Sequence, residues 1–256
     1  QFLISLAFSF IVAILIVFFL MRIQSIWLIR TWFFIVVAIA LGITLNMLIL
    51  KTNLTYSSTI ALSIGILLAY FKVFRKNIMI HNLTEMMIYP GIAVIFVTML
   101  NLWTAIVLLI LISIYDMWAV WRSGIMMKMA KYQINTVGFL GGFMLPYASK
   151  KVKEKILFLR NKYKNKKIPE NIVKNSKIKV GLAILGGGDI VFPIIVTGVF
   201  FKTFNSLPGA LTITLFSTLA LIGLFIFGDK KKAYPAMPYL TMGILLGILI
   251  AVLFVI

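Results

Sequence analysis

Long apolar stretches recur along the whole of this chain, and they constrain its fold more than any other feature. Of the 256 residues, 62% are hydrophobic, which is more than a soluble domain can bury. A stretch of about 20 apolar residues is long enough to cross a bilayer as a helix. The sequence therefore predicts an all-α polytopic membrane protein. The eight expected spans are residues 1–21, 27–50, 55–73, 82–100, 102–121, 180–201, 208–227 and 235–256.

One long segment divides the chain into 1–121, 122–179 and 180–256, with five spans before the segment and three after it. The segment carries fifteen Lys and Arg residues. If it is cytoplasmic and the spans alternate, the short cytoplasmic loops hold eight basic residues and the outer loops hold two. Because Lys and Arg concentrate in cytoplasmic loops, we expect this orientation, with Gln1 and Ile256 both outside. The lysine-rich part is typical of a solvated loop near anionic lipid, and its few aromatics disfavour nucleic-acid binding.

The rare residue types narrow the chemistry. The chain has no cysteine and a single histidine, His81, which excludes disulfides and thiolate metal sites and leaves almost nothing for histidine-based chemistry. Only six residues are acidic, and two of them, Asp116 and Asp189, lie in strongly apolar stretches. An ionisable group at membrane depth costs at least about 2.5 kcal/mol, so it marks a functional site by default. We expect His81 to lie at the membrane interface and assign no role to Glu85.

The two aspartates flank the long segment on antiparallel spans. Asp116 lies six residues before Arg122, about 9 Å along a helix axis, and Asp189 lies ten residues after Lys179, about 15 Å at the same rise. Both are therefore expected in the cytoplasmic half of the membrane, at similar depth. Two carboxyl groups in contact in a low dielectric share one proton. The ionised member can then deprotonate water while the protonated member polarises a peptide carbonyl, as in aspartic proteolysis.

Two further segments fit a site that receives a peptide. Gly186–Gly188 precede Asp189 and remove side chains where a substrate backbone would approach. Pro235 and Pro238 interrupt the start of the last span, which favours irregular backbone that can line a site and pair with an extended strand. Tyr115 precedes Asp116, points to a neighbouring helix face, and is interpreted as a packing residue.

These segments resemble the motifs of the presenilin and signal peptide peptidase family. Tyr115-Asp116 resembles its YD motif, Gly186-Gly187-Gly188-Asp189 its GxGD motif, and Pro235-Ala236-Met237 its PAL motif with Met in place of Leu. The order of the three motifs matches, and the resemblance covers most of the chain.

The resemblance implies a nine-helix intramembrane aspartyl protease that needs no metal or cofactor. Its catalytic residues would be Asp116 and Asp189, supported by Tyr115, Gly186, Gly187, Gly188, Pro235, Ala236 and Met237. Its substrates would be transmembrane segments or signal-peptide remnants, which must unwind locally. The family's first helix would be absent before Gln1, because the YD motif lies on the fifth span here and on the sixth in the family. The short chain and the lysine-rich loop resemble archaeal homologues, which implies an archaeal plasma membrane.

Two other functions stay open at this level. A proton- or cation-coupled transporter could use the same buried carboxyl groups, although no inverted repeat is apparent in the sequence. A prepilin-type peptidase would share the GxGD motif but would not require the segment Pro235–Met237. The sequence does not indicate the oligomeric state.

Overall fold

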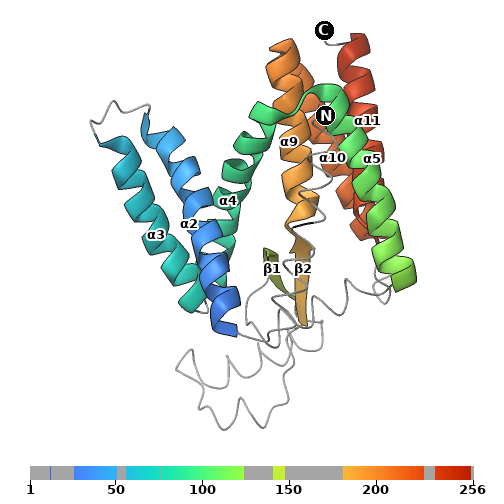
Figure 1. Ribbon diagram of the computed structural model, residues 1–256. Coiled ribbons are helices and arrows are strands. Elements are labelled where there is room, and N and C mark those ends of the chain that lie inside the picture. The colour runs from blue at the N-terminus through green and yellow to red at the C-terminus, as the bar shows by residue number, and fades with distance from the viewer. Residues whose placement is uncertain are drawn as a thin grey trace, which may run out of the picture.

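The structure is a computed structural model that describes residues 12, 26–50, 56–75, 77–123, 141–147, 181–227 and 234–254. Within these ranges it contains seven α-helices, one π-helix and a two-stranded antiparallel sheet (Figure 1). The helices are α2 (Ile26–Leu50), α3 (Ser57–Phe74), α4 (Ile78–Met99), α5 (Leu102–Met117), η1 (Trp118–Ser123), α9 (Gly188–Phe204), α10 (Leu207–Phe227) and α11 (Met237–Phe254), where η1 is the π-helix. The strands are β1 (Gly142–Tyr147) and β2 (Gly181–Gly186).

The described residues are mostly helical, which agrees with the predicted polytopic helical fold in its coarser part. Every described α-helix except α9 is long and apolar enough to cross a membrane, with α5 counted together with η1 as Leu102–Arg122, which gives six candidate spans in the described part of the chain. The seven α-helices correspond to seven of the eight expected spans. Only residue 12 of the first expected span is described, so the count of eight spans stays a prediction. Residues 150–179, the lysine-rich part of the long segment, lie outside the described ranges.

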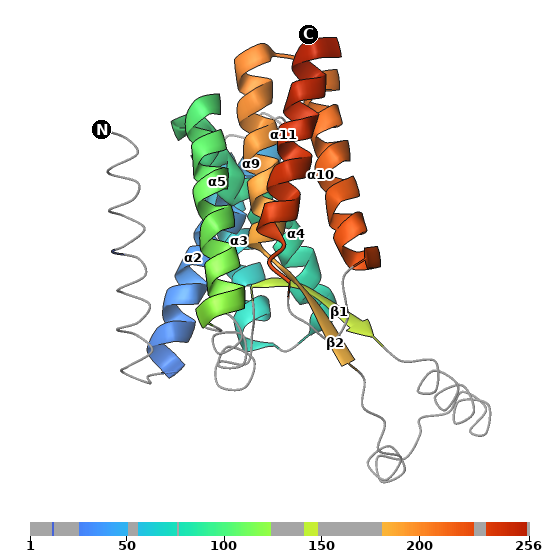
Figure 2. The ribbon, with the colours of Figure 1, turned by 90° about the vertical axis from the view of Figure 1, so that its right-hand side faces the viewer.

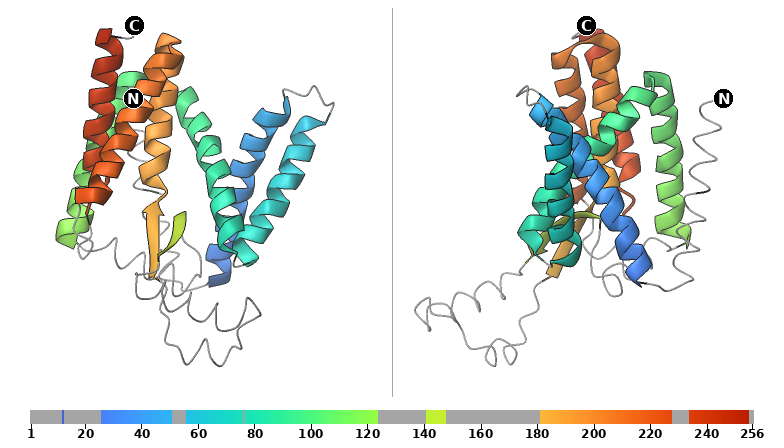
Figure 3. Two further views of the ribbon diagram at one scale, coloured as in Figure 1. Left: turned by 180° about the vertical axis from the view of Figure 1, so that it is seen from behind. Right: turned by 60° about the vertical axis from the view of Figure 1, so that its left-hand side comes forward.

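The helices form two groups that α4 connects. Helices α2 and α3 pack side by side, and α5, α9, α10 and α11 form the second group (Figures 1 and 3). Helix α4 leans across from the first group to the second and packs against both α2 and α9. Figure 2 shows the strands at one end of the helices, where β2 leads directly into α9. Strand β1 also contacts α4, so the strands lie beside the helix that connects the two groups.

Each helix group has its own hydrophobic core. The core of the second group centres on Phe200, Ile213 and Ile244, and the core of the first centres on Leu41 and Ala69. Glycine allows the closest helix contacts. A Cβ at Gly243 would lie 2.7 Å from the backbone oxygen of Phe216, and a Cβ at Gly247 would lie 2.8 Å from the Cα of Ile213. These two glycines, spaced by four residues, let α11 pack backbone to backbone against α10.

The expected helix over residues 180–201 is wrong at its start. Residues 181–186 form β2, which pairs with β1 in the register Gly142↔Gly186 to Tyr147↔Gly181, and the helix begins only at Gly188. A short apolar run between glycines fits a buried strand as well as a helix, and hydrophobicity alone does not separate the two. The partner strand lies in the long segment, far away in sequence. The fold is therefore mostly helical but not all-α.

Helix α5 changes geometry beside the first aspartate. The expected span 102–121 is an α-helix up to Met117 and a π-helix from Trp118 to Ser123. Short π-helical stretches within α-helices are frequent at functional sites because they change the direction in which side chains point. Asp116 lies two residues before this change.

Candidate active site

Asp116 is tied to the start of the last helix. Its carboxylate oxygen Oδ2 accepts a hydrogen bond from the backbone N–H of Met237 at 3.1 Å, and the backbone N–H of Ala236 also interacts with this carboxyl group. One turn earlier on α5, the hydroxyl of Ser113 lies 2.6 Å from that of Thr241 on α11, and both side chains are buried. Two polar contacts therefore hold α5 and α11 in register at the level of Asp116.

One of the two prolines has the effect expected from the sequence, since Pro235 lies in irregular backbone and Pro238 lies inside the last helix. Residues 234–236 are irregular, and α11 begins at Met237. Pro235 is fully buried, whereas Pro238 lies in the first turn of α11, where a missing N–H costs no helical hydrogen bond. The Met237 side chain is buried in the core with Leu240 and Ile244.

Asp189 lies in the first turn of α9 instead of deep inside a helix, because the residues before it form a strand. The N–H groups at a helix N-terminus favour a nearby negative charge. Two of the preceding glycines have specific neighbours. A Cβ at Gly186 would lie 3.0 Å from Oδ2 of Asp189, and a Cβ at Gly187 would lie 3.2 Å from the hydroxyl of Tyr89. Gly188 is less confined, since its Cβ would only contact Phe192 at 3.7 Å.

The fold brings the two aspartates to the same level. Asp116 is the second-last residue of α5, Asp189 is the second residue of α9, and the contact of Asp116 with Met237 is at the first residue of α11. Helix α5 packs against both α9 and α11. The carboxyl groups of Asp116 and Asp189 are close enough to interact electrostatically. Both are partly buried.

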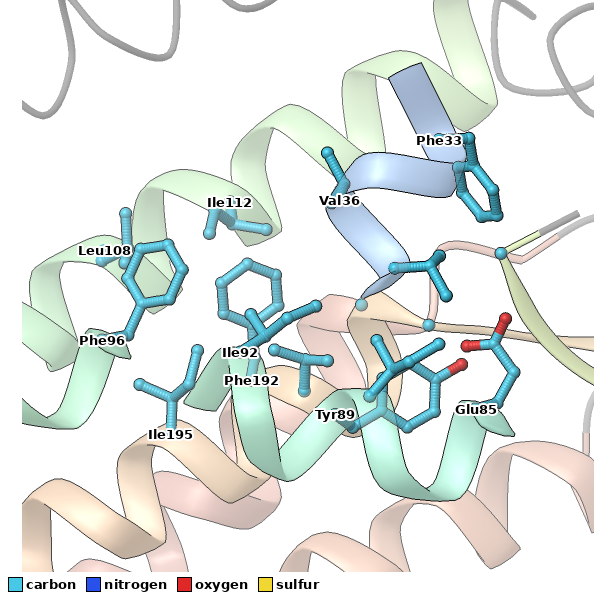
Figure 4. A pocket seen from close by; sticks show the side chains of 16 residues that line it. Phe33, Val36, Glu85, Tyr89, Ile92, Phe96, Leu108, Ile112, Phe192 and Ile195 are labelled. Carbon is cyan, nitrogen blue, oxygen red and sulfur yellow. The ribbon is translucent and has the colours of Figure 1, made fainter. Parts of the chain in front are cut away.

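An apolar cavity of about 350 Å³ begins beside the glycines that precede Asp189 (Figure 4). Its walls come from α2, α4, α5 and α9, and Gly187 and Gly188 form part of them. Glu85 and Tyr89 contribute polar groups to an otherwise hydrophobic lining. A cavity with apolar walls and a few polar groups is the usual form of a ligand site. The aspartate side chains themselves do not line it.

Tyr115 is not brought into this arrangement. Its side chain is 48% exposed, and its ring packs against Trp118 at a centroid distance of 6.2 Å. None of its contacts described here involves either aspartate. Its role as a packing residue stays a prediction.

Sequence reasoning missed a buried ionic cluster between α3 and α4. Lys72 and Glu85 form an ion pair with side chains only 0% and 3% exposed. His81 is 5% exposed, and its Nε2 lies 3.6 Å from Oε1 of Glu85, so it is a buried member of this cluster. Its expected position at the membrane interface stays a prediction. The rule that singled out the two aspartates applies equally to Glu85, which lies inside an apolar span with Lys72 at the end of the preceding one. That was the signal available in the sequence.

The described residues contain no group of three or more His, Cys, Asp or Glu side chains arranged to hold a metal ion. The acidic and histidine side chains described lie instead in two places, around Asp116 and Asp189 and around Glu85.

Comparisons with known proteins identify the family. The model of the family "Signal-peptide peptidase, presenilin aspartyl protease" matches residues 2–256. Among solved structures, the chain is similar to a presenilin family intramembrane aspartate protease with a TM-score of 0.61 and 18% sequence identity, covering 96% of this chain and 82% of the other. A search of curated proteins gives no match. The structural similarity supports the fold, and the family match covers nearly the whole chain. This chain therefore belongs to the signal-peptide peptidase and presenilin family of aspartyl proteases.

Proposed function

We propose that this protein is an intramembrane aspartyl protease of the GxGD type in which Asp116 and Asp189 act together on a water molecule. The observation that carries the proposal is the meeting of three chain segments at one level. The end of α5, the start of α9 and the start of α11 bring together two carboxyl groups and the backbone N–H of Met237. Each segment also carries one of the three motifs of the family.

The proposed reaction uses one shared proton. The ionised aspartate takes a proton from water, and the resulting hydroxide adds to the carbonyl carbon of the scissile peptide. The protonated aspartate donates a hydrogen bond and then its proton to the carbonyl oxygen, which gives a neutral gem-diol. Proton transfer to the amide nitrogen and cleavage of the C–N bond release an amine and a carboxylic acid. The pair can then return to its singly protonated state.

The surroundings of Asp116 support its role in this pair. The N–H of Met237 fixes the orientation of one carboxylate oxygen, and the contact between Ser113 and Thr241 holds the helix that supplies this N–H. A catalytic group held in place by neighbouring hydrogen bonds loses less entropy when the substrate binds. We propose that Pro235, Ala236 and Met237 act through this positioning and by lining the site.

The cavity beside Gly187 and Gly188 supports a transmembrane segment as the substrate. Its walls are apolar and reach the backbone before Asp189, so an apolar side chain could enter while the scissile bond lies over the glycines. In the described part of the chain, no strand pairs with the second edge of β2. A substrate segment that unwinds could pair with that edge or with the irregular residues 234–236.

The membrane arrangement follows from the distribution of basic residues. We propose that the long segment 122–179 is cytoplasmic and that the end at Ile256 is outside. The two aspartates would then act in the cytoplasmic half of the bilayer. The division into 1–121, 122–179 and 180–256 places one carboxylate on each side of that segment. Coupled transport, the alternative function, gains no support from the family or the fold.

The test uses the purified chain in detergent and a model transmembrane peptide, with products identified by mass spectrometry. We expect cleavage by the unchanged chain, inhibition by a transition-state analogue of aspartyl proteases, and no cleavage by Asp116→Asn or Asp189→Asn. These substitutions keep the side-chain shape, so circular dichroism should show an unchanged helix content. Retained cleavage by either variant would disprove the role of that residue. Proton-dependent solute flux in liposomes without peptide cleavage would favour a transporter.

A further inference from the structure

The outer edge of β1 is held by side chains of α4 instead of by another strand. The side-chain amide of Asn82 donates to the backbone oxygen of Met144 at 2.9 Å, and its carbonyl oxygen accepts from the N–H of Met144 at 3.0 Å. Nε2 of His81 lies 2.9 Å from the backbone oxygen of Gly142. Since a carbonyl oxygen can only accept, this nitrogen must carry the proton. The two side chains therefore reproduce part of a strand pairing.

Tyr89, a third residue of α4, contacts the end of the sheet that leads to Asp189. The ring of Tyr89 packs edge-on against that of Phe143 at a centroid distance of 5.7 Å. Gly187 lies directly against Tyr89, where a Cβ would come within 3.2 Å of its hydroxyl. Asp189 follows two residues later. Contacts made by α4 therefore fix β1 on one side and the junction between β2 and α9 on the other.

Glu85 lies at the centre of this face of α4, and Lys72 anchors it from α3. His81, Glu85 and Tyr89 are spaced by four residues, so they share one face of the helix. Nζ of Lys72 donates to Oε1 of Glu85, and the same oxygen is 3.6 Å from Nε2 of His81. Both members of the ion pair are buried. A buried ion pair adds little net stability over apolar residues of similar size, so its presence calls for a role beyond stability.

We propose that the Lys72–Glu85 ion pair is a positioning device for the active site, acting through the face His81, Asn82 and Tyr89. It holds the β1–β2 hairpin on α4 and so sets where Gly187, Gly188 and Asp189 lie relative to Asp116. The inference rests on the proposed role of Asp189 and extends it. A shift of about 1 Å at a reacting group can reduce a rate by about 100-fold. An ion pair that sets the position of the hairpin can therefore control turnover without touching the substrate.

The test separates positioning from stability with the double variant Lys72→Met/Glu85→Met in the full chain. Apolar replacement of both charges leaves no unpaired ion, so the thermal unfolding temperature should stay close to that of the unchanged protein. We expect kcat for the model peptide to fall at least about tenfold. Affinity for the transition-state analogue should fall by a similar factor, because that analogue needs both aspartates in place. The variant Asn82→Ala, which frees the edge of β1, should show the same pattern.

Lys202→Met is the matched control. Lys202 on α9 donates to the backbone oxygens of Val97 and Thr98, so it also joins α9 to α4, but at the end of α4 that is far from the hairpin. Its loss should leave kcat within about twofold. The proposal is overturned if both test variants keep normal kcat and inhibitor affinity. It is also overturned if Lys202→Met lowers kcat as much as the two test variants do. Loss of any contact between α4 and its neighbours would then be enough to explain the effect.

Asp189→Asn in the same assay distinguishes failure of the proposed catalytic function from failure of the positioning role of the Lys72–Glu85 ion pair. If the unchanged chain cleaves and Asp189→Asn does not, the proposed function stands whatever the Lys72 and Glu85 variants do. If Asp189→Asn also cleaves, the proposed function fails first.

Discussion

The absence of a side chain at Gly186 leaves space for the carboxyl group of Asp189. The residue sits at the end of β2, and a Cβ there would lie 3.0 Å from Oδ2 of Asp189, closer than nearly all real contacts of a Cβ atom. The need for glycine at this position therefore comes from the neighbouring aspartate. The conformation is not left-handed, since Gly142 is the glycine with a positive φ among the described residues.

We predict that Gly186→Ala lowers kcat by about 10- to 100-fold with a small change in stability. The added methyl group must push the carboxyl group of Asp189 aside, and a misplaced reacting group is costly even when the shift is small. Peptide cleavage and thermal unfolding measure the two effects. Gly223→Ala on α10 is the control, because a Cβ there meets no atom within 4 Å. Normal turnover by Gly186→Ala would show that the added methyl group does not displace the carboxyl group of Asp189, which contradicts the prediction.

The sequence predicted those residues of the candidate site whose charge is unusual for their surroundings. Asp116 and Asp189 are carboxylates in apolar stretches, and the spacing of the spans indicated that they meet. The Lys72–Glu85 pair follows the same rule but was missed because charges near span ends are usually solvated. The contact between Asn82 and Met144 could not be predicted, since it joins a helix to a strand 62 residues away.

At the level of elements, the hairpin is the part of the fold that the sequence did not reveal. Every α-helix described was expected within a few residues except α9, which begins eight residues later than expected. Helices were predictable because length and hydropathy suffice to find a span. Residues 181–186 are apolar enough to resemble the start of a membrane-spanning helix. They form a strand because they pair with β1. Long-range pairing of this kind leaves no local signal.

The register of the hairpin can be tested with introduced cysteines, because the natural chain contains none. Met144 uses its backbone N–H and oxygen to bind Asn82, so Met144↔Ile184 is a pair without hydrogen bonds between the strands. Cβ atoms come closest in such pairs. We therefore expect Met144→Cys/Ile184→Cys to form a disulfide on mild oxidation, detected by mass spectrometry of the digested protein.

The matched control is Met144→Cys/Leu185→Cys, which shifts one cysteine by a single residue and so turns it to the opposite face of the sheet. It should remain reduced under the same conditions. Efficient oxidation of the control in place of the first pair would mean that the register is wrong. If residues 181–186 were helical, neither pair would have a reason to react selectively.

For the whole molecule, the orientation in the membrane decides from which side a substrate is cut. The hairpin, the end of α5 with Asp116 and the start of α9 with Asp189 lie toward one end of the helices, and we expect this end to face one compartment. Our proposal, based on the excess of basic residues in the loops on this side, puts that end in the cytoplasm. Helix α4 crosses the molecule from that end to the other, and both of its ends carry an exposed methionine: Met79 is 81% exposed and Met99 is 57% exposed.

We predict that Met79→Cys reacts from the cytoplasmic side and Met99→Cys from the outside. The reagent is a membrane-impermeant maleimide, applied to whole cells and to inside-out vesicles, and mass shift on a gel reads the result. The pair is matched, since both positions lie on one helix and neither contacts the candidate site. The physical basis is the excess of Lys and Arg in the loops on the hairpin side, which resist transfer across the bilayer. The reverse labelling pattern would place the aspartates in the outer half of the membrane. Cleavage would then release the outer part of a substrate close to its membrane boundary and leave a long cytoplasmic stub.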